Sequence, residues 1–415
     1  MATVTLAAVA PDSAQERFTG GGTWMAVGGG LGVLGLLVTA VLFFASASDP
    51  HGQQMVLASY LTAFVYWLGI AIAATLWQAV FHAAKARWVT VIRRGLEGIS
   101  AALPLFILLF LPIALQVMGG HGVLFDWVHP PASFSNEQLK LIAHKAPYLN
   151  PTFFIIRAVI YFAVWVGVSH SLRKWSLAQD VDGNPQQLEK MRTLGPASLP
   201  FLGLTISFAA FDWMMSLDPF WSSTIFGAYY FAGSFLAAMA VLTFVATSAM
   251  KPGQFGALLT RHHLHNLGKF ILAFTAFWAY IGFSQFMLIW IANLPEEGEW
   301  YIARMKGGWQ SVSIALVVLH FIVPFFALLS RSLKFRPWAL KLVAVWILLI
   351  HFVDLHWVIM PAIHLPHFAP HLADLTAFLG VGGVAIAFAL WRARGHYTVP
   401  VRDPYLLEAV RYTQP

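Results

Sequence analysis

Long apolar runs, separated by short polar stretches, follow one another along nearly the whole chain of 415 residues. A helix needs about 20 apolar residues to cross the hydrocarbon core of a bilayer. Ten runs meet this requirement: 24–45, 55–80, 99–118, 152–173, 198–218, 224–249, 267–293, 309–330, 338–360 and 373–391. The pattern therefore predicts an all-α integral membrane protein with ten transmembrane helices.

The same pattern divides the chain into a tail at 1–23, a ten-helix membrane domain at 24–391 and a second tail at 392–415. Asp218 precedes Pro219, and a residue before proline is disfavoured in helix. We therefore expect the fifth span to end near Asp218 and to form a tight hairpin with the sixth. The loops 119–151 and 294–308 carry amphipathic stretches, which predict ordered loops or short surface helices that dock a partner.

Composition agrees with a membrane protein, because 59 % of the residues are hydrophobic and only 10 % are charged. A soluble domain carries about 25 % charged residues. Cysteine is absent, so this chain has no disulfide, no thiolate-bound iron–sulfur cluster and no covalently attached c-type haem. The first 22 residues lack a basic stretch followed by an apolar core, so we expect no cleaved signal peptide.

The basic residues predict the orientation. One set of chain ends and loops carries 18 of the 25 Lys and Arg residues, counting Arg173 at the edge of the fourth span. The opposite loops carry four, and Arg157, Lys269 and Lys341 lie within spans. Because basic loops stay on the cytoplasmic side, both termini are predicted to be cytoplasmic. This distribution accounts for the net charge of +7 without nucleic acid as a partner.

Two acids, Asp212 and Asp218, stand at the end of the fifth span, after a run without any charge from Ala197 to Ala210. An acid inside a bilayer is costly unless it is paired, protonated or hydrated, and such residues often mark a path for protons or polar ligands. The two acids are about 9 Å apart along a helix axis and lie on different faces. We interpret Asp212 as a functional acid and Asp218 as either a second proton station or a turn cap.

The ninth span contains His351, Asp354 and His356. His351 and Asp354 are three residues apart and so share a helix face, whereas His356 points elsewhere. A carboxylate beside an imidazole suits a group that accepts and releases a proton. The alternative is a buried pair that only fixes two helices together.

Further polar residues extend this set. Arg157 of the fourth span and Ser284 and Gln285 of the seventh belong to the outer half of the membrane with the acids, His320 lies near the middle, and His170 and Lys269 lie toward the cytoplasm. The candidate proton path comprises Asp212, Asp218, His351, Asp354, His356, His320, His170, Arg157 and Lys269. We expect Asp212, His351 and Asp354 to lie within a few ångströms of one another or to be joined by water.

Three stretches resemble a known family. They are Phe211-Asp-Trp-Met-Met-Ser-Leu-Asp-Pro-Phe-Trp-Ser-Ser-Thr-Ile-Phe-Gly227, His265-Asn-Leu-Gly-Lys-Phe with Phe274-Thr-Ala-Phe-Trp-Ala-Tyr-Ile-Gly-Phe-Ser-Gln285, and Ile289-Trp-Ile-Ala-Asn-Leu-Pro-Glu-Glu297. Together they resemble the NrfD/polysulfide-reductase family of membrane subunits, and within it the ActF-type subunits of bacterial alternative complex III. The resemblance implies two four-helix bundles, made of spans two to five and six to nine, flanked by the first and tenth spans.

The resemblance also implies a place in a quinol:electron-acceptor oxidoreductase of the bacterial inner membrane. Its partners would be a second, ActC-like NrfD subunit, an ActB-like iron–sulfur and molybdopterin-type subunit, multihaem and monohaem cytochromes c, small membrane subunits and lipids. Iron–sulfur clusters and c-type haems would belong to those partners, and the sister subunit would oxidise quinol. For this chain the resemblance implies a proton path, with menaquinol or another quinol as the ligand of the complex and Asp212, His351, Gln285 and Arg157 as candidate quinone-binding residues.

Three alternatives remain open from the sequence. An ion-coupled transporter often has helices broken at corresponding places in its two halves, but Pro104 and Pro112 of the third span have no counterpart in the seventh. A b-type haem subunit needs paired axial histidines, whereas His170, His320 and His351 fall on separate spans. A purely structural anchor would use the buried polar groups only to fix helix packing.

Overall fold

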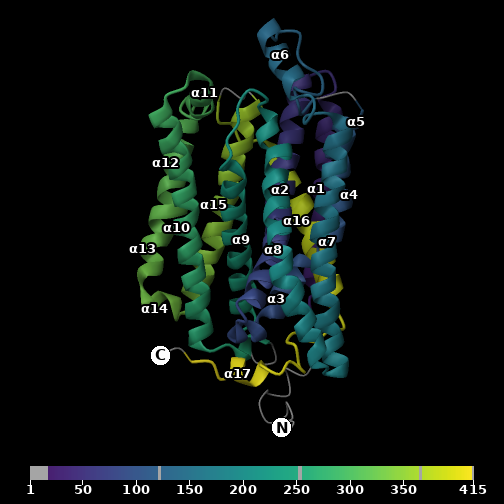
Figure 1. Cartoon of the computed structure of the whole chain (residues 1–415), viewed down its shortest axis with the longest axis vertical. Coiled ribbons are helices and arrows are strands. Elements are labelled where there is room, and N and C mark those ends of the chain that lie inside the picture. Colours follow the sequence, from purple (N-terminus) through teal and green to yellow (C-terminus); the bar gives the residue numbers. More distant parts are fainter. Residues whose placement is uncertain (1–16, 120–122, 251–254, 364–366, 414–415) are drawn as a thin grey trace.

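The computed structural model describes residues 17–119, 123–250, 255–363 and 367–413, and Figure 1 shows long helices running side by side along the long axis of the molecule. Within these residues ten segments are helical, long and apolar enough to cross a membrane. The only β-type pairing in the described part is an isolated bridge between Arg17 and Tyr397. The prediction of an all-α membrane protein with ten spans is confirmed.

Each predicted run corresponds to one helix or one group of helices. The spans are α1 (Gly22–Ala45), α2 (Pro50–Ala83), α3 to α5 (Arg93–Ser100, Leu103–Leu109, Leu111–Met118), α7 (Pro151–Asp182), α8 (Pro185–Trp213) with η4 (Met215–Leu217), α9 (Phe226–Ser248), α10 (Arg261–Ala292), α12, η6 and α13 (Trp309–Leu316, Val317–Ile322, Val323–Leu329), α15 (Pro337–Ile359) with η7 (Met360–Ile363), and α16 (Leu372–Ala393). The shorter elements are η3 (Arg87–Val91), α6 (Asn136–Lys145), η5 (Phe255–Leu258), α11 (Pro295–Ala303), α14 (Arg331–Lys334) and α17 (Leu406–Val410).

Several helices extend beyond their apolar runs. The run at 198–218, for example, belongs to a helix that already starts at Pro185, after Asn184 accepts a hydrogen bond from the amide of Gln186. Polar residues continue such a helix outside the hydrocarbon, so hydropathy marks only its embedded part.

The link between the fifth and sixth spans is longer than the predicted tight hairpin. α8 ends at Trp213, and after η4 the chain turns at Asp218 and Pro219 before α9 begins at Phe226. Asp218 adopts an extended backbone, and its carboxylate accepts the amide of Phe220 at 3.0 Å. The apolar span itself ends at Leu217, close to the predicted boundary.

The third and eighth spans are interrupted helices. Pro104 and Pro112 stand in the first turns of α4 and α5, where a missing amide hydrogen costs least. In the eighth span, η6 is a π-helix that precedes Pro324 in the first turn of α13. Short π segments inside α-helices occur often at functional sites, which draws attention to His320 within this one.

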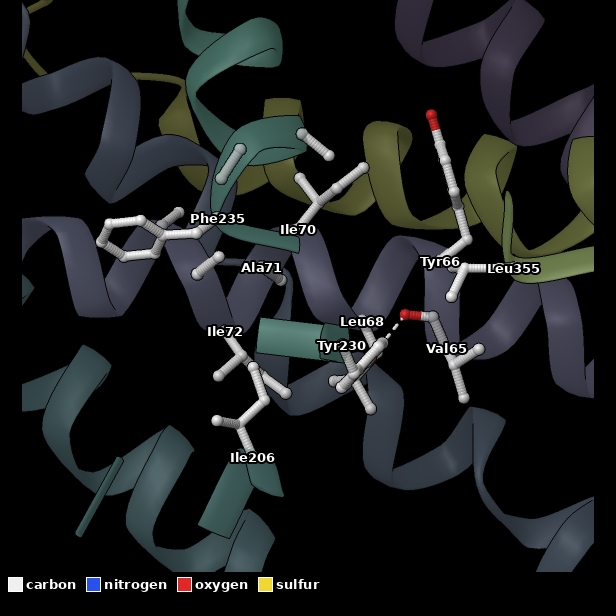
Figure 2. Close-up of a cluster of buried hydrophobic side chains, with 14 of the residues drawn as sticks. Val65, Tyr66, Leu68, Ile70, Ala71, Ile72, Ile206, Tyr230, Phe235 and Leu355 are labelled. Carbon is white, nitrogen blue, oxygen red and sulfur yellow. Dashed lines mark hydrogen bonds between the residues drawn. The ribbon is translucent and has the colours of Figure 1, made fainter. Parts of the chain in front are cut away.

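The centre of the molecule is α2. In its most apolar window 89 % of the residues are buried, and it packs against α8, α9, α15 and α16. Figure 2 shows part of this core, where the Tyr230 hydroxyl donates to the carbonyl oxygen of Val65 at 2.7 Å. On one side α2, α3 to α5, α7 and α8 form a first bundle, and α9, α10, α12, α13 and α15 form a second bundle next to it.

α1 and α16 form a separate pair on the outside of the bundles. Their backbones approach so closely that a Cβ atom at Gly32 would stand 2.4 Å from the amide nitrogen of Val384, and one at Gly383 would stand 2.4 Å from the carbonyl oxygen of Gly28. Small residues at a helix crossing are a common way to pack helices in lipid, where no hydrophobic force draws them together. The first and last spans therefore close the molecule through glycine contacts.

The two ends of the bundle differ. α6 and α11 lie at one end, and α17 and both described chain ends lie at the other (Figure 1). α6 is a surface helix that begins with a capping box between Ser135 and Gln138, as the amphipathic pattern allowed. The segment assigned to the second tail packs under the bundle, where Val399, Leu406 and Ala409 are buried.

Three spans precede α6 and ten spans separate the two chain ends, so we expect residues 136–145 to face the side of the membrane opposite to residue 413. Single cysteines at Lys140 and Arg411 of this cysteine-free chain give a direct test. An impermeant maleimide applied to intact cells should label the first position only. Labelling of Arg411→Cys in intact cells would reverse the predicted orientation.

Candidate functional site

Asp212 is bound by two side chains of the neighbouring helix. Its carboxylate receives Nε and Nη2 of Arg157 at 2.8 and 2.9 Å, and the Tyr161 hydroxyl at 2.7 Å. Arg157 also lies over the Tyr148 ring at 3.8 Å and donates to the Tyr148 carbonyl oxygen. Asp212 has no exposed surface. This bidentate ion pair satisfies the acid locally and joins α7 to α8.

Asp218 lies apart from this pair, in the turn after α8. Lys145 donates to the carbonyl oxygen of Pro219 at 2.6 Å, and its ammonium group lies within electrostatic reach of Asp218. Burial lowers the pKa of Lys145, and the negative charge of Asp218 opposes that shift. The Asp218 carboxylate accepts the amide of Phe220 and so caps the turn. This geometry agrees with the second of the two interpretations of Asp218, the turn cap.

The second bundle contains an acid with a different environment. Asp354 of α15 receives the Tyr229 hydroxyl on one carboxylate oxygen and the indole N–H of Trp278 on the other, at 3.1 Å. His351 lies one turn away, with its Nδ1 atom 3.5 Å from Asp354. The predicted shared face of His351 and Asp354 is therefore confirmed. Both residues are only 1 % exposed.

His320 completes this cluster from the π-helix η6. Its ring centroid is 6.0 Å from that of His351 and 4.1 Å from that of Trp278. Within the described residues, none of the four ring nitrogens of His320 and His351 has a hydrogen-bond partner. A buried polar group without a partner costs about 1–3 kcal/mol, so such groups usually bind water, exchange protons or contact a ligand.

The acid of the first bundle does not join this histidine cluster. Asp212 of α8 is hydrogen-bonded to Arg157 and Tyr161 of α7. Helices α2 and α9 each pack against both α8, which carries Asp212, and α15, which carries His351 and Asp354. The expectation that Asp212 lies beside His351 and Asp354 is thus not met by any direct contact in the described chain. The reason is that Arg157 gives Asp212 a partner of opposite charge on the neighbouring helix.

The other candidates occupy separate places. His356 lies with Nδ1 at 3.6 Å from Asp374 of α16, a carboxylate that also accepts the Ser59 hydroxyl at 2.7 Å. His170 on α7 and Lys269 on α10 are exposed on the surface of the bundle. They therefore lie outside the buried clusters that the structure brings together.

A cavity of about 460 Å³ lies beside Asp354, between α10 and α12 and under α11. The Tyr229 and Trp278 side chains that bind Asp354 form part of its wall. Gln285 also lines it, and the Gln285 Oε1 atom is buried without a partner among the described residues. Exposed Phe283 and Ile314 belong to the same wall, so the cavity opens toward the lipid face.

Arg304 and Tyr301 form the polar part of the cavity roof. Arg304 is 1 % exposed, stacks on the Trp300 ring at 3.3 Å and donates to three backbone carbonyl oxygens. Burial lowers the pKa of Arg304 to about 9, so the guanidinium stays charged at neutral pH. Burial raises the pKa of Tyr301 to about 12, although a hydrogen bond from Gln285 opposes the shift.

Sequence reasoning missed several residues of these clusters. Tyr161 lies four residues after Arg157, a spacing that places both on one face and signals a shared partner. Tyr229 and Trp278 gave no such signal, since aromatic residues are common in every span of this chain. Arg304 was counted only as a loop charge, although it is one of the largest fully buried side chains.

No cluster of three or more His, Cys, Asp or Glu residues with metal-binding geometry occurs in the part of the chain that the structure describes. His263 forms a capping box with Thr260 at the start of α10. No protein-family model matches this chain, and no curated protein matches it. The functional assignment therefore depends on the geometry of the residues described above.

Proposed function

We propose that this protein is a proton-conducting membrane subunit of a quinol-oxidising electron-transfer complex, of the NrfD-like and ActF type that its three motifs resemble. The observation that carries the proposal is the pair of buried imidazoles, His320 and His351, with unpartnered ring nitrogens next to Asp354. An imidazole can accept a proton on one ring nitrogen and release a proton from the other, and a carboxylate beside it favours the charged form.

Polar atoms continue from this cluster along the second bundle. The Thr243 hydroxyl of α9 and the Thr275 hydroxyl of α10 are buried and lack a hydrogen-bond partner among the described residues, and the buried Ser234 hydroxyl of α9 interacts with Tyr230. Counted along α9, Ser234 and Thr243 lie progressively farther from Tyr229 toward the end with the chain termini. Such hydroxyls are suitable partners for ordered water. A proton route through the second bundle would run from them to His351 and Asp354.

The first bundle has a supporting role in this proposal. Arg157 and Asp212 neutralise each other, so they fix α7 against α8 rather than exchange protons. The surface helix α6 stands at the end of the molecule opposite to the chain termini (Figure 1). We assign this end to the cluster-bearing and haem-bearing partners of the complex.

Purification of a tagged chain from its native membrane in a mild detergent is expected to yield c-type haem and iron–sulfur absorbance from bound partner subunits. After the partners are stripped, the chain itself should retain neither signal, because it has no cysteine to hold them. Quinol oxidation by the reconstituted complex should acidify the outside of the vesicles. Purification of the chain alone, or with transporter subunits, would contradict the proposal.

A second role, quinol binding within this chain, is favoured by the cavity beside Asp354. Its volume falls in the range of about 300–1,000 Å³ for small-molecule sites, and it is aromatic with few polar groups. Gln285 offers a free Oε1 acceptor to a quinol hydroxyl. Among the four candidate quinone-binding residues, the cavity wall includes Gln285, whereas Arg157 and Asp212 already bind each other.

Gln285→Leu is expected to weaken binding of a quinol analogue by about tenfold, the effect of losing about 1.4 kcal/mol of hydrogen bonding. Equilibrium binding of a fluorescent quinol analogue to the purified protein measures the change. Gln116→Leu, a similar substitution on α5 away from the cavity, is the matched control. Equal binding by the two variants would exclude this cavity as the quinol site.

A further inference from the structure

A second cavity, of about 260 Å³, lies at the end of the molecule that contains the chain termini. Its walls come from α2, α3, α4, α7, α9 and α16, from Phe18 and from the segment after α16. The apolar side chains include Trp67, Ile99, Phe106, Ile386 and Leu390. Ile386 is 43 % exposed, so this groove is open to the surface that faces the acyl chains of the bilayer.

Positive charge gathers at one end of the groove. Arg94, Arg173 and His396 line it, and Arg17 and Arg392 also lie within electrostatic reach of His396. Arg173 donates to the carbonyl oxygen of Arg392, which holds α7 and the end of α16 together. Burial lowers the pKa of His396, and the four guanidinium groups lower it further.

Nearby carboxylates do not balance all of these cations. Below the groove, Arg93 pairs with Asp403 at 2.7 Å, and Arg94 pairs with Glu97 and Asp180. Five arginines of this region (Arg17, Arg93, Arg94, Arg173 and Arg392) thus face three acids, which leaves a net charge of +2. Among the described residues, no carboxylate forms an ion pair with Arg17, Arg173 or Arg392. The rim of the groove therefore keeps an excess of positive charge.

We propose that the groove is a binding site for one anionic phospholipid. Its phosphate is held by Arg173 at the rim, with Arg17 and Arg392 as further positive charges, and one acyl chain lies along Ile99 and Ile386. Guanidinium groups bind phosphate through strong charge-assisted hydrogen bonds. Basic pockets between transmembrane helices on the basic side of a protein have the chemistry that anionic headgroups require.

The apolar wall distinguishes this ligand from free phosphate. Gly98 lies in the groove, and a Cβ atom placed on it would meet no other atom within 4 Å. Because the Cβ atom meets open space, we expect a leucine side chain at this position to extend into the groove and to block an acyl chain but not an inorganic ion. Gly98→Leu and Arg173→Gln thus remove the two halves of the proposed site separately.

Binding is tested by native mass spectrometry of the delipidated protein in neutral detergent, titrated with phosphatidylglycerol, phosphatidylcholine or inorganic phosphate. We expect phosphatidylglycerol to bind most tightly. Arg173→Gln and Gly98→Leu should each weaken it at least about tenfold, the effect of losing one charge-assisted hydrogen bond or the chain contacts. Lys174→Gln removes the same charge from the next, exposed position on α7 and should change nothing.

Three results would overturn the proposal. They are equal affinity for phosphatidylcholine and phosphatidylglycerol, an Arg173→Gln protein that binds like Lys174→Gln, and displacement of the lipid by inorganic phosphate in the wild-type protein. If Arg173→Gln does not fold, Gly98→Leu and Arg392→Gln decide the question, because neither position carries a buried ion pair in the described structure.

Discussion

Asp354→Asn is expected to lower quinol-driven proton release at least about tenfold while the complex still assembles. Asparagine has the shape of aspartate, and its carbonyl oxygen can still accept a bond from Tyr229 or Trp278. The substitution removes the carboxylate charge that lies 3.5 Å from the Nδ1 atom of His351. Since a positioned proton donor or acceptor contributes about 10²–10⁴-fold to a proton-transfer step, turnover should fall in parallel.

The measurement uses purified complex in vesicles with a pH-sensitive dye outside. His351→Phe and His320→Phe should show the same loss, whereas His170→Phe, an exposed histidine on α7, should behave like the wild type. Asp182→Asn at the exposed end of α7 controls for the loss of a carboxylate. Wild-type turnover and proton yield in Asp354→Asn would leave these residues with a structural role only.

Arg157→Leu is expected to destabilise the protein by about 3–5 kcal/mol, since it leaves the Asp212 carboxylate buried and without its cation. The effect should appear as a large fall in the thermal unfolding temperature in detergent. The double replacement Arg157→Leu with Asp212→Leu should recover most of the loss, because an apolar pair of similar volume avoids burying a charge.

Lys174→Leu on the same helix serves as the control, because its side chain is exposed. A stable Arg157→Leu protein would show that Asp212 is protonated or hydrated rather than paired. In that case Asp212 would remain a candidate proton carrier. The predicted instability would instead show that Asp212 serves to hold α8 against α7.

The positions of the spans were predictable because hydropathy depends on the chain alone. The ends of the helices were less predictable. α8 starts at Pro185, 13 residues before the apolar run, and hydropathy does not detect this part of the helix because its residues are polar. For the loop 119–151 the sequence allowed either an ordered loop or a short surface helix. The structure contains the helix α6, which begins with the capping box between Ser135 and Gln138.

Within the candidate site, the local pair His351 and Asp354 followed from helix periodicity. The partner of Asp212 did not, although Arg157 was already a candidate. Nothing in a single sequence tells which of several polar residues on different spans meet, since that depends on how α7, α8 and α15 pack. The unpartnered state of His320 likewise depends on the apolar and aromatic groups around it, such as Trp278.

The pairing of α1 with α16 has a consequence for biogenesis. Only 17 % of the apolar window of α1 is buried, and its principal neighbour is the last span to leave the ribosome. Until α16 is synthesised, the Gly28 and Gly32 face of α1 can contact only lipid or another protein. A chain truncated before residue 372 thus leaves that face without its partner, which distinguishes incomplete molecules from complete ones.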